Sequence, residues 1–111
     1  MKIYGIPNCD SMQKAFKYLA THDVSFEFHN YRTDGITKKT IEKWLKKVPL
    51  DVLLNKKSST YKALMPDQIP QNEEDTVALM VSKPTVMKRP VLEVGTKVIV
   101  GFDEAVYQKL K

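Results

Sequence analysis

Residues 5–11 read Gly5-Ile6-Pro7-Asn8-Cys9-Asp10-Ser11 and contain the one cysteine of this 111-residue chain. A short apolar run lies before this segment and an amphipathic stretch follows it, so the thiol is expected where a strand turns into a helix. The first turn of a helix leaves backbone N–H groups without partners and carries the positive end of the helix dipole. Both features favour the thiolate, which is the reactive form of cysteine.

The residues around this segment predict a strand, a helix and a second strand. Residues 2–6 are expected to form a buried strand, and Asp10 or Ser11 can cap a helix that runs to about residue 21. Apolar residues recur along one face of this helix at Met12, Ala15, Phe16 and Leu19. Residues 25–31 alternate in polarity, with Phe26 and Phe28 on one side, and predict the second strand. Such an order over ~30 residues favours a βαβ unit with parallel strands.

The middle of the chain, about residues 37–84, predicts a block of helices. Thr37 and Asn72 are each expected to cap a helix. Short helical turns are expected between these two helices, at residues 50–54 and 61–65, and prolines follow several of the predicted ends. This block separates the predicted βαβ unit from the remainder of the chain.

The last part of the chain predicts a hairpin and a final helix. Two apolar runs, residues 91–94 and 97–100, flank Gly95-Thr96, which fits a type II′ turn. Asp103 is expected to cap a helix over residues 104–110. The whole order therefore predicts one α/β domain over residues 1–111, with a mixed sheet of about four strands and an inserted helical block.

Composition excludes several classes of function. The formal net charge is +5 and comes mostly from lysine, but aromatic residues do not interleave with the basic ones, so a solvated surface is expected and no direct nucleic-acid binding. No apolar run is long enough to span a membrane, and no signal peptide or metal-ligand spacing is present. A single cysteine forms no internal disulfide, which fits the reducing cytoplasm.

Several short segments, taken in order, resemble the arsenate reductase (ArsC) family. They are Tyr4-Gly5-Ile6-Pro7-Asn8-Cys9-Asp10-Ser11 with Lys14-Ala15, then Tyr31-Arg32-Thr33-Asp34-Gly35, Leu53-Leu54-Asn55-Lys56-Lys57, Lys88-Arg89-Pro90-Val91 and Val100-Gly101-Phe102. The resemblance covers essentially the whole chain and implies a thioredoxin-like fold with an inserted helical block. The family includes glutaredoxin-coupled arsenate reductases, Spx-type regulators that bind RNA polymerase, and thiol-reductase-like members, which this chain resembles most.

The resemblance implies roles for Cys9, Arg89 and Pro90. Cys9 matches the nucleophile, and Arg89 would stabilise its thiolate and hold an anionic substrate group. In thioredoxin-like folds the peptide bond before the proline that Pro90 matches is usually cis and faces the cysteine, although only ~5–6% of X-Pro bonds are cis in general. The alternatives are an inert buried cysteine and an arginine in a surface ion pair. The charge of Asp10 would raise the pKa of the thiol.

Three further residues are, together with Pro90, candidates for binding a substrate. Asn8 could orient the loop before the cysteine, and Lys14 could reach back toward the thiolate or a glutathione carboxylate unless it is simply solvated. Lys57 could supply a positive charge near Asn55, where the arsenate reductases carry an arginine. A third family arginine falls near Val100-Gly101, which holds no cation. Because an oxyanion needs several fixed donors, these losses disfavour arsenate as the substrate.

The resemblance therefore implies a cytoplasmic thiol oxidoreductase that uses one cysteine and binds no cofactor. Glutathione, as co-substrate, or a glutaredoxin-type partner would supply the second thiol. The alternative is an Spx-like regulator that binds RNA polymerase, although Met12 stands where the second cysteine of a Cys-x-x-Cys switch would be. A family member that retains only the fold is a third possibility. His22 and His29 are expected to be ordinary surface or structural residues.

Overall fold

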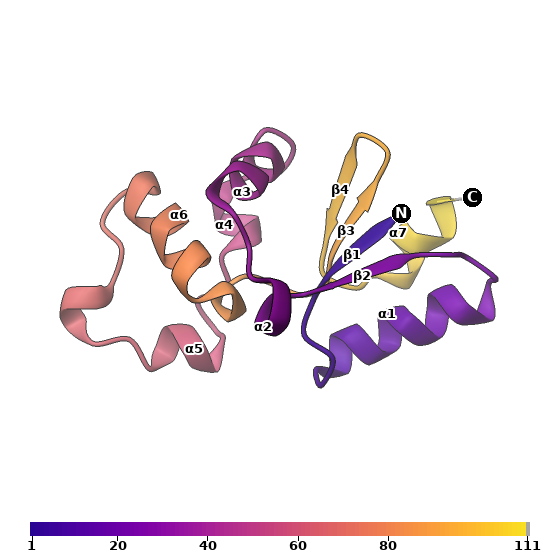
Figure 1. The fold of residues 1–111 in the computed structure, drawn as a ribbon, viewed down its shortest axis with the longest axis horizontal. Helices are drawn as coiled ribbons and strands as arrows, with labels where there is room; N and C mark the ends of the chain where they lie inside the picture. Colours follow the sequence, from indigo (N-terminus) through magenta and orange to yellow (C-terminus); the bar gives the residue numbers. More distant parts are fainter. Residues whose placement is uncertain (111) are drawn as a thin grey trace. The chain divides into compact units, whose positions relative to one another are not determined.

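The computed structural model describes residues 1–110, which form two compact units (Figure 1). The sheet unit holds residues 1–33 together with the residues from Arg89 on, and the helical unit holds Asp34–Lys88. Within residues 1–110, every helix is too short or too polar to cross a membrane. The single domain over the whole chain stays a prediction.

The sheet unit contains the predicted mixed sheet of four strands, in the order β2-β1-β3-β4. Strand β1 pairs in parallel with β2, as the predicted βαβ unit requires, and β3 pairs antiparallel with both β1 and β4. At the hairpin, Gly95 has a φ of +59°, whereas Thr96 is not among the residues of positive φ, which fits the predicted type II′ turn. The strands are β1 (Lys2–Gly5), β2 (Glu27–Asn30), β3 (Val91–Val94) and β4 (Lys97–Val100).

Helices α1 (Asp10–Thr21) and α7 (Glu104–Tyr107) pack on the same hydrophobic core of the sheet unit (Figure 1). The core joins Ile3 and Leu92 of the sheet to Met12 and Leu19 of α1 and to Tyr107 of α7. Asp103 caps α7 as predicted, its side chain accepting a hydrogen bond from the N–H of Ala105 at 3.0 Å. The chain then continues as a 3₁₀ turn, η3 (Gln108–Leu110).

The aromatic pair Phe26 and Phe28, just before and within β2, also faces this core. The ring of Phe16 on α1 lies 5.5 Å from that of Phe26 and 5.1 Å from that of Phe28, between centroids. The predicted strand over residues 25–31 is nevertheless too long at both ends, because β2 begins at Glu27 and Tyr31–Asp34 forms a single helical turn, α2. The side chain of Asn30 accepts a hydrogen bond from the N–H of Arg32 at 2.9 Å and so starts this turn.

The helical unit follows the predicted caps closely. Thr37 accepts a hydrogen bond from the N–H of Thr40 at 3.2 Å, and Asn72 accepts one from the N–H of Asp75 at 2.8 Å. The helices are α3 (Lys38–Leu45), α4 (Leu50–Leu53), α5 (Ser59–Lys62) and α6 (Glu73–Ser82), with 3₁₀ turns η1 (Pro66–Gln68) and η2 (Pro84–Val86). The helical turn predicted at residues 61–65 is misplaced, because α5 ends at Lys62 and Met65 is 62% exposed.

Replacing Asn72 by alanine is expected to lower the free energy of unfolding by about 1 kcal/mol, because α6 loses its side-chain cap. Asn72→Asp is the matched control, since aspartate caps a helix about as well as asparagine and should retain nearly all of the stability. Urea unfolding of the three proteins measures the difference. Equal losses in both variants would show that the cap does not stabilise α6.

Gly5 ends β1 against α1, where no side chain fits. A Cβ atom at this position would overlap the Sδ and Cε atoms of Met12, which is fully buried. Gly5→Ala is therefore expected to lower the free energy of unfolding by about 1–3 kcal/mol through overpacking. Chemical denaturation of Gly5→Ala, Met12→Ala and the double variant tests the cause. Overpacking predicts that the double variant loses less free energy of unfolding than the two single variants lose together. A loss equal to the sum of the single losses would refute it.

Candidate active site

Cys9 occupies the N-cap position of α1, directly before the first helical residue. Its backbone is extended, with φ −132° and ψ 134°, and its carbonyl oxygen accepts a hydrogen bond from the N–H of Gln13 at 3.0 Å. The prediction that Asp10 or Ser11 caps this helix is wrong, because the helix begins at Asp10 and no side-chain oxygen caps it. The sulfur instead stands where a capping oxygen would be, facing the free N–H groups of the first turn.

The surroundings of Cys9 lower the pKa of its thiol. Burial raises this pKa, but a hydrogen bond from the Arg89 side chain opposes burial, as do the backbone N–H groups of Met12 and Ser11 and the charge of Arg89. The combined effect is downward, although Asp10 lies next in the chain. The site can therefore hold a thiolate at a partly exposed position, which nucleophilic chemistry requires.

Arg89 and Pro90 lead into β3, and the peptide bond between them is cis. Pro90 is buried, and its carbonyl oxygen accepts a hydrogen bond from the N–H of Gly101 at 2.7 Å, which joins this segment to the end of β4. Arg89 is half-buried and donates to the Cys9 sulfur. The sheet thus brings together two residues from opposite ends of the chain.

The other three predicted binding residues, Asn8, Lys14 and Lys57, are all exposed, and only Asn8 and Lys14 belong to the sheet unit. Asn8 is exposed, and its side-chain oxygen accepts a hydrogen bond from Nη1 of Arg32 at 3.3 Å. Lys14 is exposed on α1 and forms no hydrogen bond or ion pair within residues 1–110. Lys57 is exposed in the helical unit, where its backbone N–H donates to Oδ1 of Asn55 at 3.1 Å. Substrate binding by Asn8, Lys14 and Lys57 stays a prediction.

Tyr4, His29 and Tyr31 form a cluster of aromatic side chains that the sequence analysis does not predict. Tyr4 of β1 donates a hydrogen bond to Oε1 of Glu93 at 2.9 Å, and its ring lies 4.8 Å from that of His29. The ring of Tyr31 lies 6.3 Å from that of His29, and its buried hydroxyl has no hydrogen-bond partner within residues 1–110. Burial raises the pKa of Tyr31, and the charge of Arg89 opposes this rise. Period-two alternation in β1 and β2 could have indicated that Tyr4 and His29 share a face.

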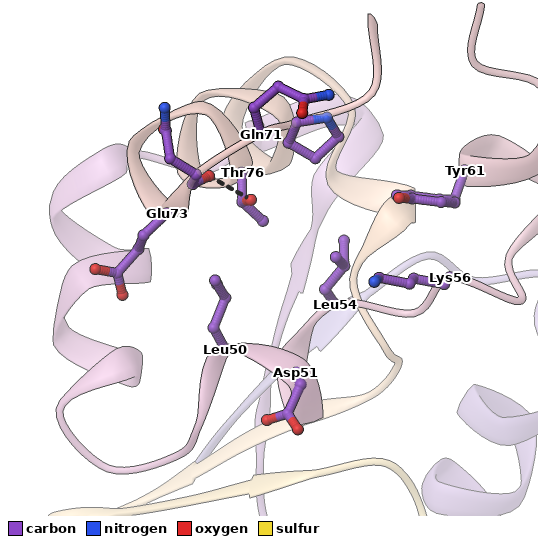
Figure 2. Close-up of a pocket in the computed structure, with 10 residues that line it drawn as sticks. Leu50, Asp51, Leu54, Lys56, Tyr61, Gln71, Glu73 and Thr76 are labelled. Atoms are coloured by element: carbon purple, nitrogen blue, oxygen red, sulfur yellow. Dashed lines mark hydrogen bonds between the residues drawn. The ribbon is translucent and has the colours of Figure 1, made fainter. Parts of the chain in front are cut away.

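The helical unit contains a pocket of about 440 Å³ (Figure 2). Figure 2 shows the side chains of Lys56 and Tyr61 pointing toward Leu54, while the carboxylates of Asp51 and Glu73 lie at the rim. The lining residues are Leu50, Asp51, Leu54, Lys56, Tyr61, Pro70, Gln71, Asn72, Glu73 and Thr76. Its size suits a small ligand, but the predicted Lys57 does not line it.

The fold and the site define the class of protein. A four-stranded mixed sheet in the order β2-β1-β3-β4, with a cysteine at the N-cap of the helix that follows the first strand, places this chain among the thioredoxin-like thiol proteins. A model of the ArsC family matches residues 4–110, and the chain belongs to this family.

Solved structures and curated relatives agree with this assignment. The structure matches the YffB protein with a TM-score of 0.92 and 34% identity, over 96% of this chain and 95% of that one. It matches an arsenate reductase (ArsC) related protein from Brucella melitensis with a TM-score of 0.75 and 38% identity, over 96% and 90% of the two chains. An uncharacterized protein of Haemophilus influenzae is 38% identical over 108 residues, which are 96% of this chain and 94% of that protein.

More distant relatives include transcriptional regulators. The global transcriptional regulator Spx of Lactiplantibacillus plantarum is 24% identical over 104 residues, covering 92% of this chain and 79% of the regulator. The relatives of this chain thus include an arsenate reductase (ArsC) related protein and a global transcriptional regulator.

Proposed function

We propose that this protein is a cytoplasmic, glutathione-linked thiol oxidoreductase that works through Cys9. The observation that supports it is the placement of the Cys9 sulfur at the start of α1 with Arg89 donating to it, which lowers the pKa of the thiol. A partly exposed, anionic sulfur is the group that attacks a disulfide.

The reaction requires no bound cofactor. The Cys9 thiolate attacks one sulfur of a mixed disulfide between glutathione and a second thiol, and the sulfur–sulfur bond breaks. The second thiol leaves as a thiolate with the electron pair and takes a proton from water, and Cys9 is left joined to glutathione. A second glutathione, as thiolate, attacks that bond and releases glutathione disulfide, which restores the Cys9 thiolate. Since Cys9 is the only cysteine, the resolving thiol must come from outside the chain.

Mass spectrometry of the intact protein tests this proposal. After exposure to glutathione disulfide, we expect one glutathione adduct per chain, located at Cys9, and its loss when reduced glutathione is added. A protein that forms no adduct, or one that glutathione does not reverse, would contradict the proposal. Arsenate is not proposed as a substrate, because the positions of two family arginines hold Asn55 and Val100-Gly101.

The likeness to Spx supports a second candidate, a regulator that binds RNA polymerase. Met12 takes the place of a second cysteine and is fully buried, so an internal disulfide switch cannot form. Binding to polymerase does not depend on such a switch. A pull-down with purified RNA polymerase, using the wild-type protein and Cys9→Ser, separates the two candidates: recovery of polymerase by both proteins would favour the regulator.

A further inference from the structure

Arg32 lies beside the Cys9 loop, although its position in the chain is remote from it. Its Nη1 atom donates a hydrogen bond to Oδ1 of Asn8 at 3.3 Å, and Asn8 immediately precedes Cys9. The side chain of Arg32 is otherwise exposed. A second guanidinium group, in addition to that of Arg89, is therefore held by the residue that precedes the candidate nucleophile in the chain.

The backbone that carries Arg32 is fixed on both sides. The preceding residue, Tyr31, is buried with 4% exposure and anchors the turn in the sheet unit. The N–H of Arg32 donates to the side chain of Asn30 at 2.9 Å, and the hydroxyl of Thr33 donates to the carbonyl of Asn30 at 3.4 Å. An arginine side chain on a free loop would lose much entropy on binding a ligand, whereas this one is already restrained.

The charge of Arg32 is available to a ligand. Within residues 1–110 no carboxylate forms an ion pair with it, and its single side-chain hydrogen bond leaves most of its five N–H donors unused. A guanidinium group with free donors matches the planar geometry of a carboxylate.

We infer that Arg32 is a specificity-determining residue that binds a carboxylate of the disulfide substrate. This inference rests on the proposed function and names the substrate class, which is a disulfide with an anionic peptide-like group such as glutathione. Arg32 takes no part in the bond exchange. While it holds the carboxylate, the Cys9 thiolate forms the new sulfur–sulfur bond, and the departing half of the disulfide leaves as a thiolate with the electron pair.

Two probes with the same peptide–disulfide framework separate this role from a structural one. They are glutathione disulfide and its tetraethyl ester, in which every carboxylate is masked. The rate of adduct formation at Cys9 is measured by mass spectrometry for the wild-type protein, Arg32→Gln and Asn8→Ala. We expect Arg32→Gln to slow the reaction with glutathione disulfide about fivefold. The rate with the ester should stay unchanged or rise in this variant. The pKa of Cys9 should stay unchanged.

The hydrogen bond between Arg32 and Asn8 provides the control variant, Asn8→Ala. Asn8→Ala frees the guanidinium of Arg32 without removing its charge. This variant should therefore slow adduct formation with glutathione disulfide less than Arg32→Gln does. An equal loss with both probes, or no loss with either, would overturn the role of Arg32 while the reactivity of Cys9 stands. A wild-type protein that forms no adduct with either probe would overturn the proposed function itself, and this inference with it.

Discussion

Replacing Cys9 by serine is expected to slow disulfide exchange with glutathione by about a thousandfold or more, because a neutral hydroxyl is a far weaker nucleophile than a thiolate. No other residue can substitute, since the chain has one cysteine. Exchange is measured as the rate at which glutathione disulfide forms from a small mixed disulfide, with the protein as catalyst.

The same substitution carries its own control for folding. Cys9 is the N-cap of α1, and serine is among the preferred residues at that position. Cys9→Ser should therefore unfold at the same urea concentration as the wild-type protein, or at a slightly higher one. Loss of activity with intact stability identifies the sulfur as the reacting group, whereas activity that survives in this variant would exclude Cys9 as the nucleophile.

Replacing Arg89 by methionine is expected to raise the pKa of Cys9 and to slow its reaction at neutral pH, by at most about tenfold for each unit by which the pKa rises. Burial raises this pKa, and the hydrogen bond and charge of Arg89 are two of the effects that oppose burial. Methionine keeps the length of the side chain but removes both effects. The thiolate is lost as the pH falls through the pKa, so in the variant this loss begins at a higher pH.

The rate of alkylation by iodoacetamide, followed against pH, measures this shift. Lys88→Met is the matched control, because Lys88 is an exposed cation beside Arg89 and is not among the groups that shift the pKa of Cys9. Its profile should match that of the wild-type protein. An Arg89→Met profile that also matches the wild type would show that Arg89 does not stabilise the thiolate.

Local chemistry made most of the fold predictable. Capping by Thr37, Asn72 and Asp103 depends on residues within a few positions, as does the turn at Gly95-Thr96, and all four features are present. The parallel pairing of β1 with β2 follows from the length of the connecting helix. Such features need only nearby sequence, which is why pattern and propensity were sufficient.

One error arose where a longer contact outweighed a local preference. Asp10 and Ser11 are better capping residues than cysteine, yet Cys9 takes the cap position, with its sulfur at the start of the helix beside Arg89. The contact of Arg32 with Asn8 joins the segments that follow two neighbouring parallel strands, β2 and β1, and has no signal in either segment alone. The proximity of Cys9 and Arg89 was expected only from the family resemblance, because spacing along the chain does not indicate it.

The pKa of Cys9 in the wild-type protein tests the central claim most directly. It is obtained from the rate of alkylation as a function of pH, with Cys9→Ser as the blank. The site geometry predicts a value clearly below the ~8.5 of an unperturbed cysteine, so that thiolate is well populated at neutral pH. A value at or above ~8.5 would contradict the account, because burial would then outweigh Arg89 and the N–H groups of α1.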